Sequence, residues 1–478
     1  MEVSQITFML DQELLEIDFS QVNYSPTTTV LNFLRSRSDR KGTKEGCAEG
    51  DCGACTVVVA ELSDEGNLKY KACDSCLIFL PMLHGRQLLT VESLKQNGHL
   101  HPVQKAMVES DGSQCGYCTP GIVMSLYAMF KSGEQDTSTL IDGLTGNLCR
   151  CTGYRPILEA AIKSVSATSN DVDKQEQQTI KILRQIDDNR KNLKLSFREQ
   201  NYIKPKDLDS ALVALAENNK AMLVNGATDI GLMVTKQRKV LKNLIDISDI
   251  RELKQINVHS NSIEYGAGVS LEDVKNSAEK HFPALYKMLV VFGSRQIREL
   301  GTLGGNVANA SPIGDTPPVL MALNAQIKLI SSKGIRSLPI QEFITGYRQT
   351  DLRPGELIYS IVVPRDQDDA IIEGYKISKR KDLDISTVSG GFRLKLNTDD
   401  TIQDIKLYYG GMAEMIKNAS EAESFLLGKK WERSNVEAAQ ELVEDEFSPI
   451  SDARSGANGR SVMAKNLLLK FWDETRAN

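Results

Sequence analysis

Eight of the nine cysteines fall into two sets of four, and each set has the spacing of a [2Fe–2S] site. The first set combines a C-x4-C-x2-C run with one distant cysteine, and it consists of Cys47, Cys52, Cys55 and Cys76. The second set combines a C-x2-C motif with a later C-x-C motif, and it consists of Cys115, Cys118, Cys149 and Cys151. Soft sulfur stabilises iron–sulfide cores better than oxygen or imidazole does. Two one-electron centres on one chain indicate a protein that transfers electrons.

The first cysteine run lies in a glycine-rich stretch, residues 46–55, directly before the strand-like run 56–60. Glycine adopts positive φ without strain and leaves backbone N–H groups free to point at sulfur. A zinc site usually takes two C-x2-C pairs or mixed Cys and His ligands, which this spacing fits poorly. Disulfides are not favoured, because we find neither a signal-peptide pattern nor an apolar run of membrane-spanning length. We predict a cluster in a loop anchored to a β-rich domain.

The second set is unusual because one residue separates Cys149 from Cys151. On a helix the two side chains would point about 200° apart, so both reach one cluster only from a turn or an opening helix N-terminus. Helical patterns at 122–130 and 157–162 follow the two cysteine pairs. We expect two helices that each present a cysteine pair near the N-terminus, where the helix dipole favours an anionic cluster.

The ninth cysteine, Cys73, lies three residues before Cys76 and is an alternative ligand. The context of Cys76 leads directly into an apolar run, which favours Cys76 as the ligand. Cys73 is expected to be a small, semi-buried side chain.

Three motifs resemble those of the xanthine dehydrogenase family of molybdenum hydroxylases. They lie at residues 42–57, 114–121 and 146–157, and together they carry seven of the eight cysteines assigned above, with Cys76 following downstream. The remainder of the chain looks like the FAD-binding part of that family, and the resemblance stops where the family's molybdopterin domain would begin. The chain is therefore similar to the small, iron–sulfur/flavin subunit of a bacterial two-subunit xanthine dehydrogenase.

Two glycine-bearing loops, at 223–231 and 301–315, could bring backbone N–H groups close to a diphosphate. The loop at 223–231 does not have the G-x-G-x-x-G spacing of a Rossmann fold. The resemblance implies that these loops hold the FAD diphosphate and that the loop at 378–387 controls access to the flavin, with Tyr347 beside the nicotinamide site. The FAD contacts that it implies are Leu223, Val224, Asn225, Gly226, Ala227, Thr228, Asp229, Phe292, Gly293, Thr302, Gly304, Gly305, Asn306, Asn309, Asp315, Ile358 and Lys376.

Composition and patterning indicate a multidomain α+β protein, and the alternation over residues 5–19 predicts a β-hairpin. The 478 residues are 41% hydrophobic and 25% charged with a net charge of −6, which gives no indication of nucleic-acid binding. With the resemblance, we expect a β-grasp plant-type [2Fe–2S] ferredoxin-like domain at 1–82, an all-α [2Fe–2S]-binding domain at 83–163, and a linker at 164–200 with at most one amphipathic turn of helix. An α+β FAD-binding domain of the molybdopterin-dehydrogenase (PCMH) type at 201–365 and a C-terminal α+β flavoprotein domain at 366–478 follow. Ser434 and Glu437 are expected to form a capping box that opens a helix at 435–446.

The resemblance implies an electron-transfer subunit of xanthine dehydrogenase, which converts hypoxanthine and xanthine to urate in purine catabolism. Purine oxidation would take place at molybdopterin on a large partner subunit, in a heterotetramer of two small and two large chains. Electrons would pass singly through the second and then the first cluster to FAD, which joins one- and two-electron chemistry, and on to NAD+. The expected location is cytoplasmic, without membrane or nucleic-acid partners, and no catalytic residue is assigned in this chain.

Two alternatives remain open. The chain could be the iron–sulfur/flavin subunit of another molybdenum hydroxylase that oxidises aldehydes or N-heterocycles, although in many such relatives these parts are separate chains. It could also be a free-standing flavin/iron–sulfur carrier that serves several partners. A large exposed apolar patch on the second cluster domain would favour an obligate partner instead.

Overall fold

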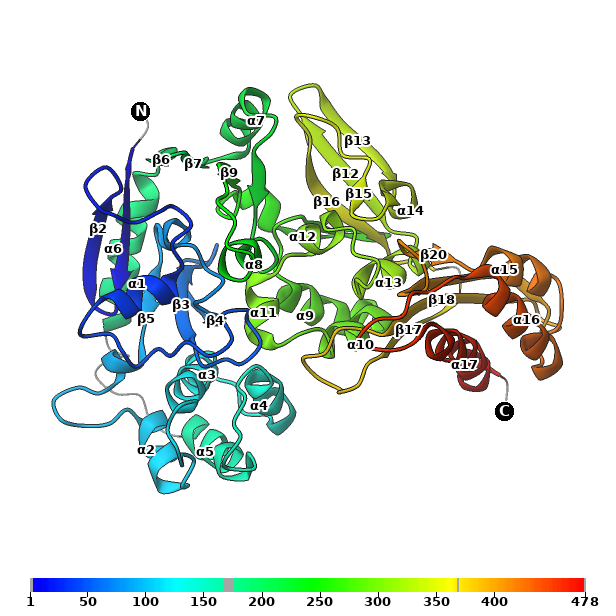
Figure 1. The fold of residues 1–478 in the computed structure, drawn as a ribbon, viewed down its shortest axis with the longest axis horizontal. Coiled ribbons are helices and arrows are strands. Elements are labelled where there is room, and N and C mark those ends of the chain that lie inside the picture. Colours follow the sequence, from blue (N-terminus) through cyan, green and yellow to red (C-terminus); the bar gives the residue numbers. More distant parts are fainter. Residues whose placement is uncertain (1–2, 167–174, 368, 477–478) are drawn as a thin grey trace. The chain divides into compact units, whose positions relative to one another are not determined.

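A computed structural model describes residues 3–166, 175–367 and 369–476 of the chain. The chain forms two compact units, and many of their elements are labelled in Figure 1. One unit comprises residues 1–250 together with 294–301, and the other comprises residues 251–293 together with 302–478. The short segment 294–301 therefore belongs to the first unit although its neighbours in sequence belong to the second.

The first unit begins with the five-stranded sheet of a β-grasp domain, in the order β2-β1-β5-β3-β4. The strands are β1 (Gln5–Leu10), β2 (Glu13–Asp18), β3 (Thr56–Leu62), β4 (Leu68–Asp74) and β5 (Gln87–Leu89), and the hairpin expected near the N-terminus is confirmed as β1 and β2. Helix α1 (Val30–Ser36) packs its apolar residues against this sheet. Strand β5 pairs with both β1 and β3, beyond the boundary expected at residue 82, because buried Leu88 and Leu89 complete the sheet.

Strand β3 shows how the sheet serves two cores. Side chains alternate between the faces of a strand, so Val57 and Val59 join the core with α1, whereas Val58 and Ala60 join a second, helical core. The helical region expected after the first domain is confirmed, and its helices are α2 (Pro102–Glu109), α3 (Thr119–Lys131), α4 (Thr137–Leu144) and α5 (Arg155–Val165). Two short 3-10 helices, η1 (Leu80–Leu83) and η2 (Val91–Leu94), flank β5.

The segment expected to be a linker contains a longer helix than predicted. Helix α6 (Glu176–Asp188) has thirteen residues, and its Ile180 and Leu183 are buried. The positions 167–174 of the expected linker lie outside the described residues. After α6 comes a four-stranded sheet in the order β6-β7-β9-β8. Its elements are β6 (Leu193–Phe197), β7 (Gln200–Lys204), α7 (Leu208–Glu217), β8 (Met222–Val224), α8 (Ile230–Thr235) and β9 (Asn243–Asp246), and α11 (Arg295–Leu300) completes the unit.

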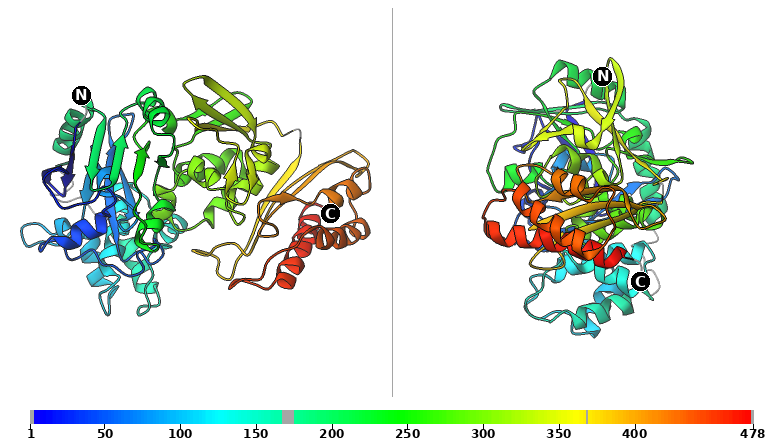
Figure 2. Two further views of the ribbon diagram at one scale, coloured as in Figure 1. Left: turned by 45° about the horizontal axis from the view of Figure 1, so that its top comes forward. Right: turned by 90° about the vertical axis from the view of Figure 1, so that its right-hand side faces the viewer.

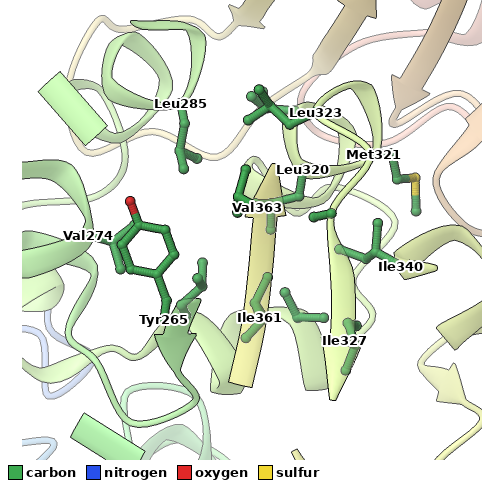
Figure 3. Close-up of a cluster of buried hydrophobic side chains, with 14 of the residues drawn as sticks. Tyr265, Val274, Leu285, Leu320, Met321, Leu323, Ile327, Ile340, Ile361 and Val363 are labelled. Atoms are coloured by element: carbon green, nitrogen blue, oxygen red, sulfur yellow. The ribbon is translucent and has the colours of Figure 1, made fainter. Parts of the chain in front are cut away.

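The second unit contains an antiparallel five-stranded sheet in the order β10-β11-β16-β12-β13. Its strands are β10 (Ile256–Val258), β11 (Ser262–Gly266), β12 (Gln326–Ser331), β13 (Gly334–Pro339) and β16 (Leu357–Pro364). The other elements are η4 (Arg251–Lys254), α9 (Leu271–His281), α10 (Pro283–Val290), α12 (Leu303–Ala308), α13 (Thr316–Ala322), α14 (Ile340–Phe343), β14 (Ile344–Gly346) and β15 (Gln349–Thr350). Figure 3 shows their shared core, in which Val274 and Leu285 of the helices face strands that carry Ile327 and Ile361.

The C-terminal part of this unit is a second antiparallel sheet, in the order β17-β18-β19-β20, with helices packed against it (Figure 2). The strands are β17 (Ile371–Ile377), β18 (Val388–Leu396), β19 (Ile402–Gly410) and β20 (Lys417–Asn418), and the helices are α15 (Ser420–Leu426), α16 (Arg433–Glu446) and α17 (Ala457–Thr475). The expected capping box is wrong: α16 begins at Arg433, and the Ser434 hydroxyl bonds to Glu432 instead. Among the described helices, none is long and apolar enough to cross a membrane.

Candidate cluster and flavin sites

The loop before β3 creates a polar environment for two cysteines of the first set. The backbone amides of Glu49, Asp51 and Cys52 donate to Cys47 Sγ at 3.4, 3.3 and 3.4 Å, and the Cys47 amide donates to Cys52 Sγ at 3.4 Å. The hydrogen bond from the Cys52 thiol, aided by these amides, lowers the pKa of Cys47 to about 5. Cluster ligands bind as thiolates, and this loop already stabilises the thiolate form of Cys47.

The other two cysteines of the first set are buried together. Cys55 and Cys76 are 2% and 1% exposed, lie in one apolar cluster with Leu77, and share a hydrogen bond between their thiols. That bond and burial raise the pKa of Cys55 well above its ordinary value. Asp74 Oδ1 accepts from the Cys55 thiol at 3.6 Å, and burial raises the pKa of Asp74 to about 7.

Cys73 occupies a different environment. It lies on β4 paired with Val57 of β3, and its side chain is part of the core beneath α1. Burial raises the pKa of its thiol well above the ordinary value. Cys76 contacts Cys55, whereas Cys73 packs among hydrocarbon side chains, which supports the choice of Cys76 as the ligand.

The second set lies at two helix starts, as predicted. Helix α3 begins at Thr119, directly after Cys118, and α5 begins at Arg155, shortly after Cys151. The Cys118 and Cys149 thiols are hydrogen-bonded to each other, as are those of Cys115 and Cys151, and all four cysteines are free. Cys115 and Cys151 are exposed, whereas Cys149 is buried.

Sequence reasoning missed two side chains that organise the Cys149 loop. The Thr152 hydroxyl donates to Cys149 Sγ at 3.2 Å, and the Cys149 amide donates to the Tyr154 hydroxyl at 2.9 Å. Burial opposes ionisation of the Cys149 thiol, but the Thr152 hydrogen bond and neighbouring amides outweigh it and lower the pKa. For Cys118, burial prevails and raises the pKa to about 12. Tyr154 adopts a left-handed conformation with φ of 69°, a signal that the sequence does not carry.

The eight cysteines therefore form four neighbouring pairs, two in each set. The pairs are Cys47 with Cys52, Cys55 with Cys76, Cys115 with Cys151, and Cys118 with Cys149. Within the described part of the chain, no three Cys, His, Asp or Glu side chains converge on one point that could hold a lone metal ion. A [2Fe–2S] cluster is held by four cysteines, and two irons that each take two thiolates require this pairwise arrangement. The donor sets thus fit binuclear clusters.

The expected FAD contacts divide between the two units. In the first unit, the segment 223–229 leads from the end of β8 to the start of α8. Gly226 has φ of 77°, and a Cβ there would overlap with the Leu300 carbonyl oxygen, so only glycine fits. Ala227 also has positive φ, at 61°, and its side chain is buried. This tight turn exposes Asp229, at the start of α8.

In the second unit, the expected glycine loop contains the short helix α12. Thr302 caps this helix, with its hydroxyl accepting from the Gly305 amide at 3.1 Å, and Asn306 Oδ1 accepts from the Thr316 hydroxyl at 2.6 Å. A Cβ at Gly304 would press on Ala267, so Gly304 serves close packing within the unit. Gly305 is exposed on the same helix, where a ligand could approach the backbone.

The structure brings together two expected flavin contacts that lie far apart in sequence. Lys376 Nζ bonds to Asp315 Oδ2 at 2.7 Å and to the Val291 carbonyl at 3.0 Å, and both charged side chains are nearly buried. The Ser386 hydroxyl donates to Asp315 Oδ1 at 2.6 Å. Ser386 is an addition that sequence reasoning missed, although it lies in the predicted access loop. The network fixes both carboxylate oxygens of Asp315.

The remaining expected positions differ in accessibility. Ile358 lies on β16 with its side chain in the core, which leaves mainly its backbone available to a ligand. Phe292 and Gly293 are half-buried, and Phe292 packs against that core. Tyr347 is 60% exposed. In the loop 378–387, the basic residues are exposed, whereas its last residues are buried.

Comparison with known proteins agrees with this architecture. Three family models match: a [2Fe-2S] binding domain at residues 90–162, an FAD binding domain in molybdopterin dehydrogenase at 195–366, and a CO dehydrogenase flavoprotein C-terminal domain at 373–475. The xanthine dehydrogenase of Emericella nidulans is 31% identical over 94% of this chain, and the aldehyde oxidase 2 of Macaca fascicularis is 30% identical over 95%. The chain spans 37% and 38% of those two relatives.

Among solved structures, quinoline 2-oxidoreductase from Pseudomonas putida 86 matches with a TM-score of 0.54 and 25% identity, covering 59% of this chain and 98% of that chain. A carbon monoxide dehydrogenase chain from Hydrogenophaga pseudoflava matches with the same TM-score and identity, covering 58% and 96%. The fold and the matched domains place the chain among iron–sulfur flavoproteins. It belongs to the molybdenum hydroxylase family, as the iron–sulfur and FAD-binding part that xanthine dehydrogenases carry in their N-terminal regions.

Proposed function

We propose that this chain is the electron-transfer subunit of a xanthine dehydrogenase that receives electrons from a molybdopterin-containing partner and delivers them to NAD+. The observation that carries the proposal is the arrangement of eight cysteines as two sets of paired thiols on a chain with an FAD-binding domain. When bound, two clusters would carry single electrons and FAD would collect them in pairs for hydride transfer.

The chain's own residues have distinct roles in this proposal. The amides around Cys47 hold its sulfur as a thiolate, and the Thr152 hydroxyl does the same for Cys149. The buried Lys376–Asp315 pair places fixed charges where the family resemblance puts the flavin ring. In this proposal the tight turn at Gly226 lets the backbone of the 223–229 loop approach the FAD diphosphate.

A partner chain is supported by apolar side chains around the exposed cysteines of the second set. Tyr117, Leu148 and Tyr154 are 50%, 38% and 45% exposed, and each lies within three residues of a second-set cysteine. Exposed aromatic and aliphatic groups beside an electron-transfer site are typical of a surface that another protein covers. The chain spans less than two-fifths of the length of these curated xanthine dehydrogenases. We propose a heterotetramer of two small and two large chains in the cytoplasm.

Xanthine as the substrate rests on the xanthine dehydrogenases among the relatives, including that of Oryza sativa subsp. japonica at 31% identity over 93% of this chain. A second candidate is a molybdenum hydroxylase for aldehydes or N-heterocycles. It is favoured by the likeness to aldehyde oxidase 2 and to quinoline 2-oxidoreductase. Turnover by the assembled complex with xanthine, an aldehyde and quinoline separates the candidates.

The first test is the metal and flavin content of the purified chain, with an EPR spectrum after reduction by dithionite. We expect about four irons, about one FAD and two rhombic signals per chain. Cys76→Ala should remove one signal, whereas the matched control Cys73→Ala should retain both. The chain alone should reduce a dye with NADH and should not oxidise xanthine. Zinc in place of iron, or loss of a signal in Cys73→Ala only, would contradict the assignment.

A further inference from the structure

We propose that Gln296 is a positioning residue that holds the two cluster-binding loops in contact and thereby sets the magnetic and electronic coupling between the two cluster sites. The inference rests on the proposed function in one respect, because it requires that both cysteine sets hold clusters. Gln296 lies on α11, within the short segment 294–301 that belongs to the first unit.

Gln296 is fully buried, and its amide group is directed into the second cluster domain. Gln296 Nε2 lies 3.0 Å from the Ser125 hydroxyl, 3.0 Å from the Gly143 carbonyl and 3.1 Å from Asn147 Oδ1. These acceptors belong to α3, α4 and the loop that leads to Cys149. One amide therefore joins three segments of the helical domain.

Asn147 transmits this contact to the first cluster loop. Its Oδ1 accepts from Gln296 and from the Ser125 hydroxyl at 2.6 Å, which orients the side-chain amide. Its Nδ2 then donates to the Gly53 carbonyl at 3.2 Å and to the Thr56 hydroxyl at 3.1 Å. Gly53 lies between two cysteines of the first set, and Asn147 lies two residues before Cys149.

A main-chain hydrogen bond completes the link. The Leu148 amide donates to the Cys52 carbonyl at 3.0 Å, so a residue adjacent to Cys149 is bonded directly to a ligand residue of the first set. The distance between the two cysteine sets therefore depends on whether the hydrogen bond between the Leu148 amide and the Cys52 carbonyl stays formed. Asn147 supplies a second bond one residue away, and Gln296 fixes Asn147.

Three glycines allow the loops to approach so closely. A Cβ on Gly53 would overlap with the Gly146 carbonyl, and a Cβ on Gly121 would overlap with the Gly53 carbonyl. A Cβ on Gly146 would overlap with Gln296 Oε1. The absence of a side chain at Gly146 therefore leaves room for the Gln296 side chain, which contacts the loop that precedes Cys149.

Ion pairs on either side of Gln296 fix the helix that carries it. Arg295 pairs with Glu134 after α3, and Arg298, fully buried, bonds to both oxygens of Asp142 on α4 at 2.7 Å. The helix thus remains anchored when only the Gln296 amide is removed. A Gln296→Leu variant therefore tests the amide separately from the helix.

The test compares Gln296→Leu with Gln200→Leu in the iron-loaded chain. Gln200 is a buried glutamine in the same unit that bonds to Thr27 and the Leu241 carbonyl, so it controls for the general loss of a buried amide. The readouts are the low-temperature EPR splitting between the two reduced clusters and the hydrogen exchange of the Leu148 amide. We expect Gln296→Leu to keep about four irons, to lose the splitting measurably and to exchange the Leu148 amide at least tenfold faster.

Gln200→Leu should lower thermal stability comparably and leave both readouts unchanged. If Gln296→Leu does not fold, Gln296→Glu is measured in the same way, since a carboxylate keeps the size but cannot donate to Asn147. Unchanged splitting and exchange in the folded variant would overturn the role of Gln296 and leave the proposed function intact. About two irons or fewer in the unaltered chain would instead contradict the two-cluster function itself.

Discussion

At the scale of single residues, the surroundings of each cysteine decide its chemistry. Cys47 receives three backbone amides and has a lowered pKa, whereas Cys73, on the neighbouring strand, is surrounded by hydrocarbon and has a raised one. Cluster ligands bind as thiolates, and each of the eight assigned ligands has another assigned cysteine beside it, whereas Cys73 packs among hydrocarbon side chains. The spacing of the cysteines predicts the sets, but the contrast between Cys73 and Cys76 is decided by the direction of side chains at the end of β4.

His84 makes the stability of the first unit depend on pH. Its Nδ1 accepts from the Thr7 amide at 3.0 Å, and burial, followed by the charge of Lys204, lowers its pKa to about 4. An unfolded histidine titrates near 6.5, so the stabilisation is complete above that pH and is lost as the pH falls toward 4. We expect the free energy of unfolding to fall by about 3 kcal/mol over this range.

The measurement is urea unfolding at pH 7 and pH 4.5. His84→Asn keeps an acceptor for the Thr7 amide and does not titrate, so its stability should fall less between the two pH values. Equal losses in both proteins would show that His84 is not the responsible group.

At the scale of elements, a buried ionic network joins the two sheets of the first unit. Lys204 at the end of β7 bonds to Asp246 at 2.8 Å and to Asp249 at 3.0 Å, and Arg86, before β5, bonds to Asp249 at 2.5 Å. The Tyr202 hydroxyl donates to Asp246 at 2.5 Å. The network aligns the sheet that leads to the Gly226 turn with the β-grasp sheet.

Removal of one partner from this network leaves buried charges without compensation. Lys204→Met should therefore destabilise the unit by about 3–5 kcal/mol, measured by urea unfolding. The exposed Lys242, which pairs with Glu199 at 3.0 Å, offers the control: Lys242→Met should cost less than about 1 kcal/mol. A similar loss in both variants would contradict the importance of burial.

The elements that sequence patterns predict are those with local signals. Alternation identifies β1 and β2, and the apolar run 122–130 identifies α3. The start of α16 is mispredicted because Ser434 bonds to Glu432 on its own N-terminal side. The contact of Gln296 with Asn147 joins positions 149 residues apart, and no local pattern encodes it. The same holds for the bond of Lys376 to Asp315, where the residue types alone do not indicate an ion pair.

At the scale of the whole molecule, the exposed apolar groups of the second cluster domain predict a docking surface. Leu148→Lys should weaken binding of the proposed molybdopterin-containing partner at least tenfold, about 1.4 kcal/mol, because a charge must then be desolvated in the interface. Binding is measured by titration of the large chain with the iron-loaded small chain. Val213→Lys alters a similarly exposed apolar side chain on α7 and should leave binding unchanged.

Iron content and the Leu148 amide bond must be unaltered in Leu148→Lys for the comparison to hold. Equal affinities of Leu148→Lys and the unaltered chain would place the docking surface elsewhere. Equal weakening by Val213→Lys would indicate a general effect of added charge.

The segment 294–301 also has a consequence for how the protein is made. A ribosome completes both cysteine sets by residue 151, yet Gln296, Arg298 and their helix are synthesised well over a hundred residues later. At about 5–20 residues per second, that delay is on the order of ten seconds. During this interval the nascent chain presents the faces of α3 and α4 that α11 will cover. Until α11 is made, the hydrogen bonds of Gln296 to Ser125 and Asn147 and of Arg298 to Asp142 cannot form.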